Sequence, residues 1–278
     1  MNNVFNFKRF AKYYSYDLNN AIGSYGLSAI VTGMLPLILL FFSVLFSLIF
    51  TGEVATIPPQ VKIFLFGIAV LVVILSAPAK LYGRLTERKA GTDWLMIPAS
   101  PFEKFLSMAL MLCVLLPLVV FGLFAACDLL LGWIVPAYGG SILATIKQTP
   151  DIGDLTEMMT DMPVIRTTAG GTVASIWAGW CASVLPFGLG AICFKKGKAA
   201  KTILCIFALE IVLSMFFVLV LKGVTGSFDG ELFVKSLFDG MSAEKVQFWT
   251  NFLINALYFV IIGGLLAAIY FRVKTIKH

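Results

Sequence analysis

Few side chains in this sequence of 278 residues are suited to catalysis. The only histidine, His278, is the last residue, so the sequence offers no Ser–His–Asp arrangement, no H-E-x-x-H motif and no histidine-based zinc site. The five cysteines include no CxxC pair, which favours reduced packing residues over a disulfide framework or a metal cluster. A phosphate-binding G-x-x-x-x-G-K-[ST] loop is missing too. We therefore expect a chain that is not an enzyme and binds no metal or cofactor.

Two acids, Asp128 and Glu210, stand inside long apolar stretches. An ionisable group inside a membrane costs about 3 kcal/mol on insertion scales, and such groups usually face the interior of a helix bundle or a wet cavity. Glu210 is the first candidate to line a substrate path, to contact a cationic or hydroxyl-bearing ligand or to titrate during transport. The alternative is a structural role, in which Glu210 is protonated or hydrogen-bonded to Ser214, Asn251 or Asn255. Asp128 is the second candidate for the path, closer to the outer end of its stretch.

These acids are set in the sequence of a membrane protein. Hydrophobic residues make up 59% of the chain and charged residues 13%, compared with about 25% charged residues in soluble domains. We predict an all-α, polytopic membrane protein with one transmembrane domain over residues 1–278. A span needs roughly 20 apolar residues, and Pro36 and Pro117 predict kinks within two of the spans. The six predicted spans cover residues 27–50, 61–79, 105–134, 172–194, 202–221 and 248–271.

The orientation follows from the distribution of lysine and arginine. Fifteen of the 21 basic residues fall in the segments on one side of the spans, and that side is expected to be cytoplasmic. Both termini and the loop between the second and third spans are on that side. The net charge of +6 reflects this asymmetry, so no nucleic-acid partner is expected. We predict a multi-pass protein of the cytoplasmic (inner) membrane.

Residues 1–26 have the pattern of an amphipathic helix. Apolar side chains recur at helical spacing, and basic residues occupy the other faces. Such a helix lies in the cytoplasmic interface of a bilayer with its basic side toward anionic headgroups. Two roles stay open, which are a plain membrane anchor and a lever that touches a cytoplasmic partner. The apolar residues are Phe7, Phe10, Tyr14 and Leu18, and the basic residues are Lys8, Arg9 and Lys12.

The fourth span carries a stripe of small residues at intervals of four. This spacing lets the backbones of two membrane helices approach closely. The stripe is expected to meet another helix, either of the same chain or of a second copy. Its members are Gly171, Ser175, Gly179 and Ser183.

The loop at residues 82–104 has the sequence of a folded docking element. A charged run that includes Arg84, Glu87 and Arg88 is followed by Gly91-Thr92-Asp93, which is suited to cap a short helix. An apolar Trp94-Leu95-Met96-Ile97 cluster then ends at Pro98. Ser100-Pro101-Phe102-Glu103 forms a capping box with proline at the first helical position, and it predicts the start of the next long helix.

The topology and this loop together resemble the permease subunit of type-2 ABC exporters. The resemblance covers the whole chain in topology and some two dozen residues in motif. It implies that the short helix is a coupling helix. The positions that match the family's coupling segment are Glu87, Arg88, Gly91, Thr92, Leu95, Pro98, Ser100 and Glu103.

This resemblance implies a set of partners. A separate cytoplasmic ATPase, which itself binds ATP and Mg²⁺, would hold the helix at 91–97 in a surface cleft. Trp94 and Leu95 would be its apolar anchors, and Arg84, Glu87 and Arg88 would form salt links that set the register. A second permease chain, identical or different, would complete the pathway.

A different class of function also fits the sequence. A membrane-embedded interaction or regulatory protein that transports nothing explains the packing stripe and the docking loop equally well, and Glu210 less well. A secondary transporter is the third alternative, and the lack of a visible inverted repeat disfavours it. A neighbouring ATPase gene would favour the exporter.

Overall fold

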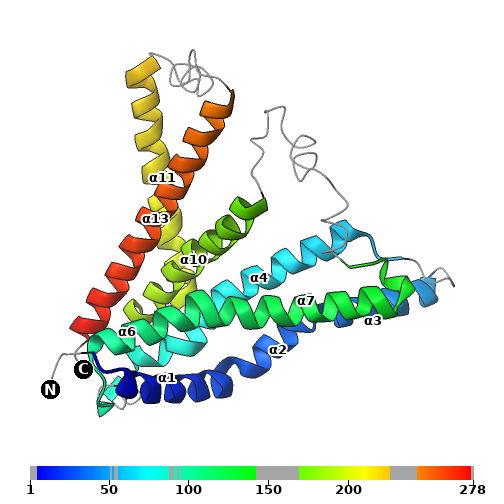
Figure 1. The fold of residues 1–278 in the computed structure, drawn as a ribbon, viewed down its shortest axis with the longest axis horizontal. Coiled ribbons are helices and arrows are strands. Elements are labelled where there is room, and N and C mark those ends of the chain that lie inside the picture. Colours follow the sequence, from blue (N-terminus) through cyan, green and yellow to red (C-terminus); the bar gives the residue numbers. More distant parts are fainter. Residues whose placement is uncertain are drawn as a thin grey trace.

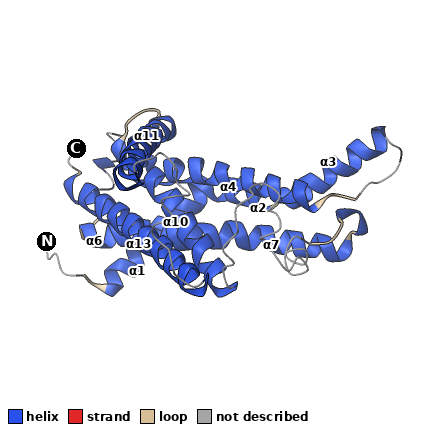
Figure 2. Ribbon diagram, turned by 90° about the horizontal axis from the view of Figure 1, so that it is seen from above, coloured by secondary structure: helices blue, strands red, loops and turns tan. Residues whose placement is uncertain are grey.

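The computed structural model describes residues 5–50, 52, 56–87, 91–92, 94, 96–141, 169–225 and 243–276. Within these ranges the chain is helical and contains no strand (Figure 2). The all-α prediction is confirmed at this level. The start of α1, the start of α6 and the end of α13 lie together at one end of the molecule (Figure 1).

In the part of the chain that the structure describes, five helical stretches are long and apolar enough to cross a membrane, and a bent pair counted as one span brings the number to six. Helices α4, α11 and α13 run several residues past both ends of the predicted spans, because their polar end turns continue the helix beyond the apolar run. The bounds of the helices are α1 Phe7–Ala21, α2 Leu27–Gly33, α3 Leu35–Phe50, α4 Pro59–Tyr82, α6 Pro101–Leu110, α7 Leu116–Ile134, α10 Ala169–Cys193, α11 Lys198–Thr225 and α13 Ala243–Thr275. Short 3₁₀ turns cover Gly83–Thr86 and Pro136–Tyr138.

The first span departs from the prediction. The expected division after residue 26 is absent, because the π-helical turn Ile22–Gly26 joins α1 to α2 in one continuous helix. The chain instead bends by 46° between Gly33 and Leu35. Pro36 accounts for the position, since it has no N–H to donate to the Thr32 carbonyl and disfavours helical geometry just before it. The kink predicted at Pro36 is therefore present.

A second irregularity lies before Pro117. A π-helical turn, Met111–Leu115, joins α6 to α7 into a helix of 34 residues. The N–H of Leu116 donates to the Met111 carbonyl, and Pro117 has no N–H. The carbonyls of Leu112 and Cys113 thus lose their usual donors.

Two tryptophans of α10 supply replacement donors for these carbonyls. The indole N–H of Trp180 donates to the Leu112 carbonyl at 3.0 Å. The indole N–H of Trp177 donates to the Cys113 carbonyl at 2.9 Å. The irregular turn is therefore satisfied by a neighbouring helix, which is how membrane proteins accommodate proline within spans.

The core lies around α10, which packs against α4, α11, α13 and the π-helical turn before α7. Trp180, Val184 and Leu185 of α10 are buried there with Leu112. Helices α3, α4 and α7 form one arm, and α11 with the first half of α13 forms another that rises away from it (Figure 1). Within the apolar window of α11, residues 203–220, no residue is buried within the described chain. The second arm thus presents apolar side chains on every side.

Candidate functional site

The segment between α4 and α6 lies at the end of the molecule where α1 begins (Figure 1). It opens with the 3₁₀ turn Gly83–Thr86, and Gly91, Thr92, Trp94 and Met96 are helical. The side-chain ammonium of Lys198, at the start of α11, donates a hydrogen bond to the Gly83 carbonyl. The capping box is present as predicted, because the Ser100 hydroxyl accepts from the Glu103 N–H and the Glu103 carboxylate accepts from the Ser100 N–H.

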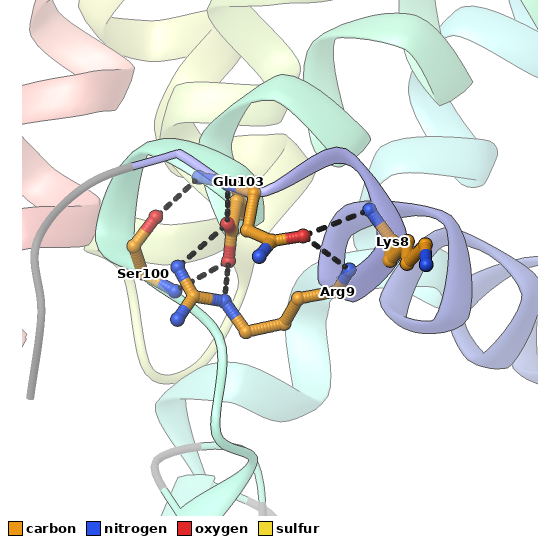
Figure 3. A network of polar contacts seen from close by, with 5 residues as sticks. Lys8, Arg9, Ser100 and Glu103 are labelled. Carbon is orange, nitrogen blue, oxygen red and sulfur yellow. Dashed lines mark hydrogen bonds and ion pairs between the residues drawn. The ribbon is translucent and has the colours of Figure 1, made fainter.

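Glu103 also connects this segment to the N-terminus. Its carboxylate accepts from Arg9 Nε at 2.8 Å and Arg9 Nη2 at 2.7 Å, from the Asn6 N–H at 3.0 Å and from the Ser100 N–H at 2.8 Å (Figure 3). The Asn6 side chain in turn caps α1 by accepting from the N–H groups of Lys8 and Arg9. We call Asn6, Arg9, Ser100 and Glu103 the Glu103 clamp. A bidentate arginine pair with two further donors is strong and directional.

The clamp shifts the pKa of Glu103. The Pro101–Ile134 helix has 34 residues, more than the roughly 20 needed to cross a bilayer core. The predicted span begins at residue 105, so the first turn, with Glu103 and Lys104, precedes it. Burial alone would raise the pKa of Glu103, but the hydrogen bonds from Arg9, Asn6 and Ser100 outweigh burial and lower it to about 2. Burial lowers the pKa of Lys104 to about 8.

Trp94 lies against α1 and does not project from the loop. Its indole N–H donates to the Tyr13 hydroxyl at 2.9 Å. Lys104 lies 4.3 Å from the centre of its ring and donates to its carbonyl at 2.8 Å. Trp94 was predicted to anchor a partner. In the structure its side chain already contacts Tyr13 and Lys104 of the same chain.

A buried carboxylate joins α1 to two further elements. Asp17 accepts from the Ser107 hydroxyl at 2.6 Å and from the Tyr82 hydroxyl at 3.0 Å. All three side chains are buried. Asp17 therefore ties α1 to α4 and α6 one helix turn beyond Tyr13. The sequence pattern of α1 marked its apolar residues and gave no signal for this acid.

Several described side chains of the loop remain accessible to a partner. Arg84, Glu87 and Pro98 are exposed, and Met96 is 80% exposed. Gly91 is buried and Thr92 is partly buried. The predicted coupling residues Arg88 and Leu95 lie outside the described residues. The sequence named Met96 only as a member of the Trp-Leu-Met-Ile cluster and did not predict it as an anchor.

Asp128 lies far from this loop along α7 and is 1% exposed. It accepts from the Tyr138 hydroxyl at 2.7 Å. Lys62 lies 3.8 Å from the centre of the Tyr138 ring and donates to the Gly140 carbonyl. All three side chains are buried, so the structure gives Asp128 a bridging position between α4, α7 and the turn after α7. It does not reach an open path there.

Glu210 is exposed and lines a groove between α10 and α11 of about 400 Å³. Among the described residues it has no hydrogen bond or ion pair. Ser214 donates to the carbonyl of Ile211 on its own helix. The side chain of Asn251 lies outside the described residues, and Asn255 is exposed. We call this space the α10–α11 groove; its lining residues are Ala182, Ser183, Pro186, Phe187, Ile203, Ile206, Phe207 and Glu210.

The described members of the small-residue stripe, Gly179 and Ser183, do not carry the close helix contacts of α10. A methyl group added at Gly179 would meet nothing within 4 Å, and Ser183 faces the α10–α11 groove. The side chains of the stripe's first two members, Gly171 and Ser175, lie outside the described residues. The close approaches of α10 occur at Gly188 and Gly190 instead. An added methyl group would lie 2.8 Å from Leu112 Cδ1 at Gly188 and 1.8 Å from Thr202 Oγ1 at Gly190.

Within the described part of the chain, no three histidine, cysteine or acidic side chains are placed to hold a metal ion. Comparison with known proteins found no matching family model, curated protein or solved structure. Two polar sites of the structure bear on function. One is the loop between α4 and α6, which packs against α1, and the other is the α10–α11 groove.

Proposed function

We propose that this chain is the membrane-spanning permease subunit of an ATP-driven exporter. A separate cytoplasmic ATPase binds the loop between α4 and α6, and ATP and Mg²⁺ belong to that partner. Both termini and the loop are placed on the cytoplasmic side of the inner membrane. Several apolar helices long enough to cross a bilayer are compatible with this location.

The observation that carries the proposal is the way the loop is held. One side of it is fixed to α1 by the Glu103 clamp and by Trp94, while Arg84, Glu87 and Met96 stay exposed. A coupling element must transmit force, so it needs rigid support on one side and a free contact surface on the other. In this proposal Met96 is the apolar anchor, and Arg84 and Glu87 set the register through charge.

A second permease chain completes the pathway. The apolar window of α11 has no residue buried within this chain, and Glu210 faces away from the core. We place the substrate path along this side of the molecule, with the α10–α11 groove as its wall. An ionisable group in a span that has no partner among the described residues supports this placement.

The test is purification of the tagged protein from its native membrane in a mild detergent, followed by mass spectrometry. We expect a stoichiometric ATPase that is lost from the Met96→Asp variant and from the Arg84→Glu, Glu87→Lys double variant. Met96 and Arg84 are exposed, so these changes should leave the fold intact. A pure preparation without an ATPase would contradict the proposal and favour the membrane-embedded interaction protein.

A further inference from the structure

The α10–α11 groove combines a wall of apolar side chains with polar groups of one kind. Phe187 and Phe207 contribute aromatic rings, and Ile203 and Ile206 contribute aliphatic surface. Ligand sites of a few hundred Å³ with such walls bind compounds of drug size. The polar groups in the groove then determine whether a positively or a negatively charged compound binds more favourably.

Every polar group that the groove offers is an acceptor. Glu210 contributes a carboxylate. The Ser183 hydroxyl already donates its proton to the Gly179 carbonyl at 2.8 Å, so only its oxygen is left for a ligand. Pro186 has no N–H, which removes the usual helical donor of the Ala182 carbonyl. Ala182 and Pro186 both line the groove.

The position of Glu210 deep within an apolar span makes the binding of a cation beside it more favourable. The helix α11 starts at Lys198, so Glu210 lies about 18 Å along it, near the middle of an apolar stretch. A carboxylate in low dielectric gains far more from a nearby positive charge than it would in water. No described lysine or arginine supplies that charge, because Glu210 takes part in no ion pair.

The two helices also open toward this site. They touch where Gly190 meets Thr202, and the absence of a side chain at Gly190 permits the contact. Toward Gly179 the space beside α10 is open, and α11 rises away from α10 (Figure 1). The groove therefore lies between a closed end and an open end, and it is accessible from the side of the molecule.

We propose that the α10–α11 groove binds a lipophilic cation, with Glu210 as the counter-ion and Phe187 and Phe207 as aromatic walls. Aromatic faces attract cations in addition to the carboxylate. This inference deepens the proposed function, because it names the substrate class of the proposed path. Binding to the groove does not need an ATPase, so it can be tested separately.

The test measures binding of tritiated tetraphenylphosphonium to the purified full chain in neutral detergent micelles. Tetraphenylborate, which has nearly the same shape and the opposite charge, is the matched probe. We expect Glu210→Gln to weaken tetraphenylphosphonium binding about tenfold or more, since it removes one partner of a poorly solvated charge pair. Glu210→Asp should keep most of the affinity, and it distinguishes loss of charge from loss of fold.

Ser214→Ala is the control variant, one turn away on the same helix and outside the groove. It should bind like the unchanged chain. Equal affinity of the unchanged chain and Glu210→Gln, or equal dependence of both probes on Glu210, would overturn the inference. So would a Glu210→Gln variant that alters only the oligomeric state, because Glu210 would then contact a second copy. A failed ATPase purification leaves this result standing, so the two proposals fail separately.

Discussion

The Glu103 clamp and the α10–α11 groove each contain a glutamate carboxylate, and the two carboxylates differ in burial and in hydrogen bonding. In the clamp a carboxylate that is 0% exposed accepts four hydrogen bonds, two of them from a single arginine. In the groove a carboxylate of the same type is exposed and has no partner among the described residues. A satisfied acid joins elements together, and an unsatisfied one is available to a ligand. The molecule thus has a rigid contact at the Glu103 clamp and a separate site open to a ligand in the α10–α11 groove.

Loss of the clamp should have the largest effect. Glu103→Ala removes a buried charged acceptor and leaves the buried Ser100 N–H and the partly buried Asn6 N–H without this partner. We expect the free energy of unfolding to fall by about 3 kcal/mol, because removing one side of an ion pair whose carboxylate is buried is costly. Denaturation by SDS in mixed micelles measures it. Glu87→Ala, an exposed acid of the same loop, is the control, and an equal loss there would contradict the clamp's role.

The closed end of the groove gives the next effect. Gly190→Ala places a methyl group against Thr202, which is buried and donates to the Lys198 carbonyl, so it cannot turn away without losing that bond. We expect a loss of about 2 kcal/mol from overpacking. Gly179→Ala on the same helix meets open space and should cost little. If the two variants unfold alike, α10 and α11 do not meet at Gly190.

The tryptophan that supports the π-helical turn gives a smaller effect. Trp180→Phe keeps an aromatic ring and removes the donor to the Leu112 carbonyl. We expect a loss of about 1 to 2 kcal/mol, the cost of one unsatisfied buried carbonyl. The same SDS titration measures it. Leu204→Ala, at an exposed position of α11, is the control, and an equal loss there would remove the specific role of the indole.

The pH dependence should be the smallest effect near neutrality. The clamp lowers the pKa of Glu103 from an ordinary value near 4.5 to about 2. Its contribution to stability is therefore complete above the ordinary pKa and is lost as the pH falls from about 4.5 toward 2. Thermal unfolding between pH 7 and pH 3 measures this. The Glu103→Gln variant should show a shallower decline over the same range, and parallel curves would contradict the assignment.

Sequence reasoning recovered the parts of this structure that depend on local pattern. The apolar runs placed the helices, the Ser100–Glu103 capping box was correct, and Pro36 marked a real bend. The connection between Arg9 and Glu103 spans 94 residues, so no local pattern could indicate it. Trp94 shows the same limit. Its type indicated a contact, but only the packed structure decides that the contact is with α1.

The small-residue stripe shows a related limit. A repeat of small residues identifies a helix face that permits close approach, and it does not say where along that face another helix comes close. Ser183 and Gly190 are seven residues apart and lie on the same face of α10. On this face α11 meets α10 at Gly190, whereas Gly179 faces open space. Glu210 was found because one charge in an apolar stretch is conspicuous. The groove beside it depends on how α11 diverges from α10, which local sequence does not determine.

In the proposed function, the loop between α4 and α6 contacts a cytoplasmic ATPase on the side opposite α1. Photo-crosslinking in native membranes tests this contact, with p-benzoyl-phenylalanine introduced at position 94 or position 96. We expect an adduct with a nucleotide-binding protein from position 96, and from position 94 only crosslinks within the chain. The absence of any ATPase adduct from position 96, or equal adducts from both positions, would contradict it.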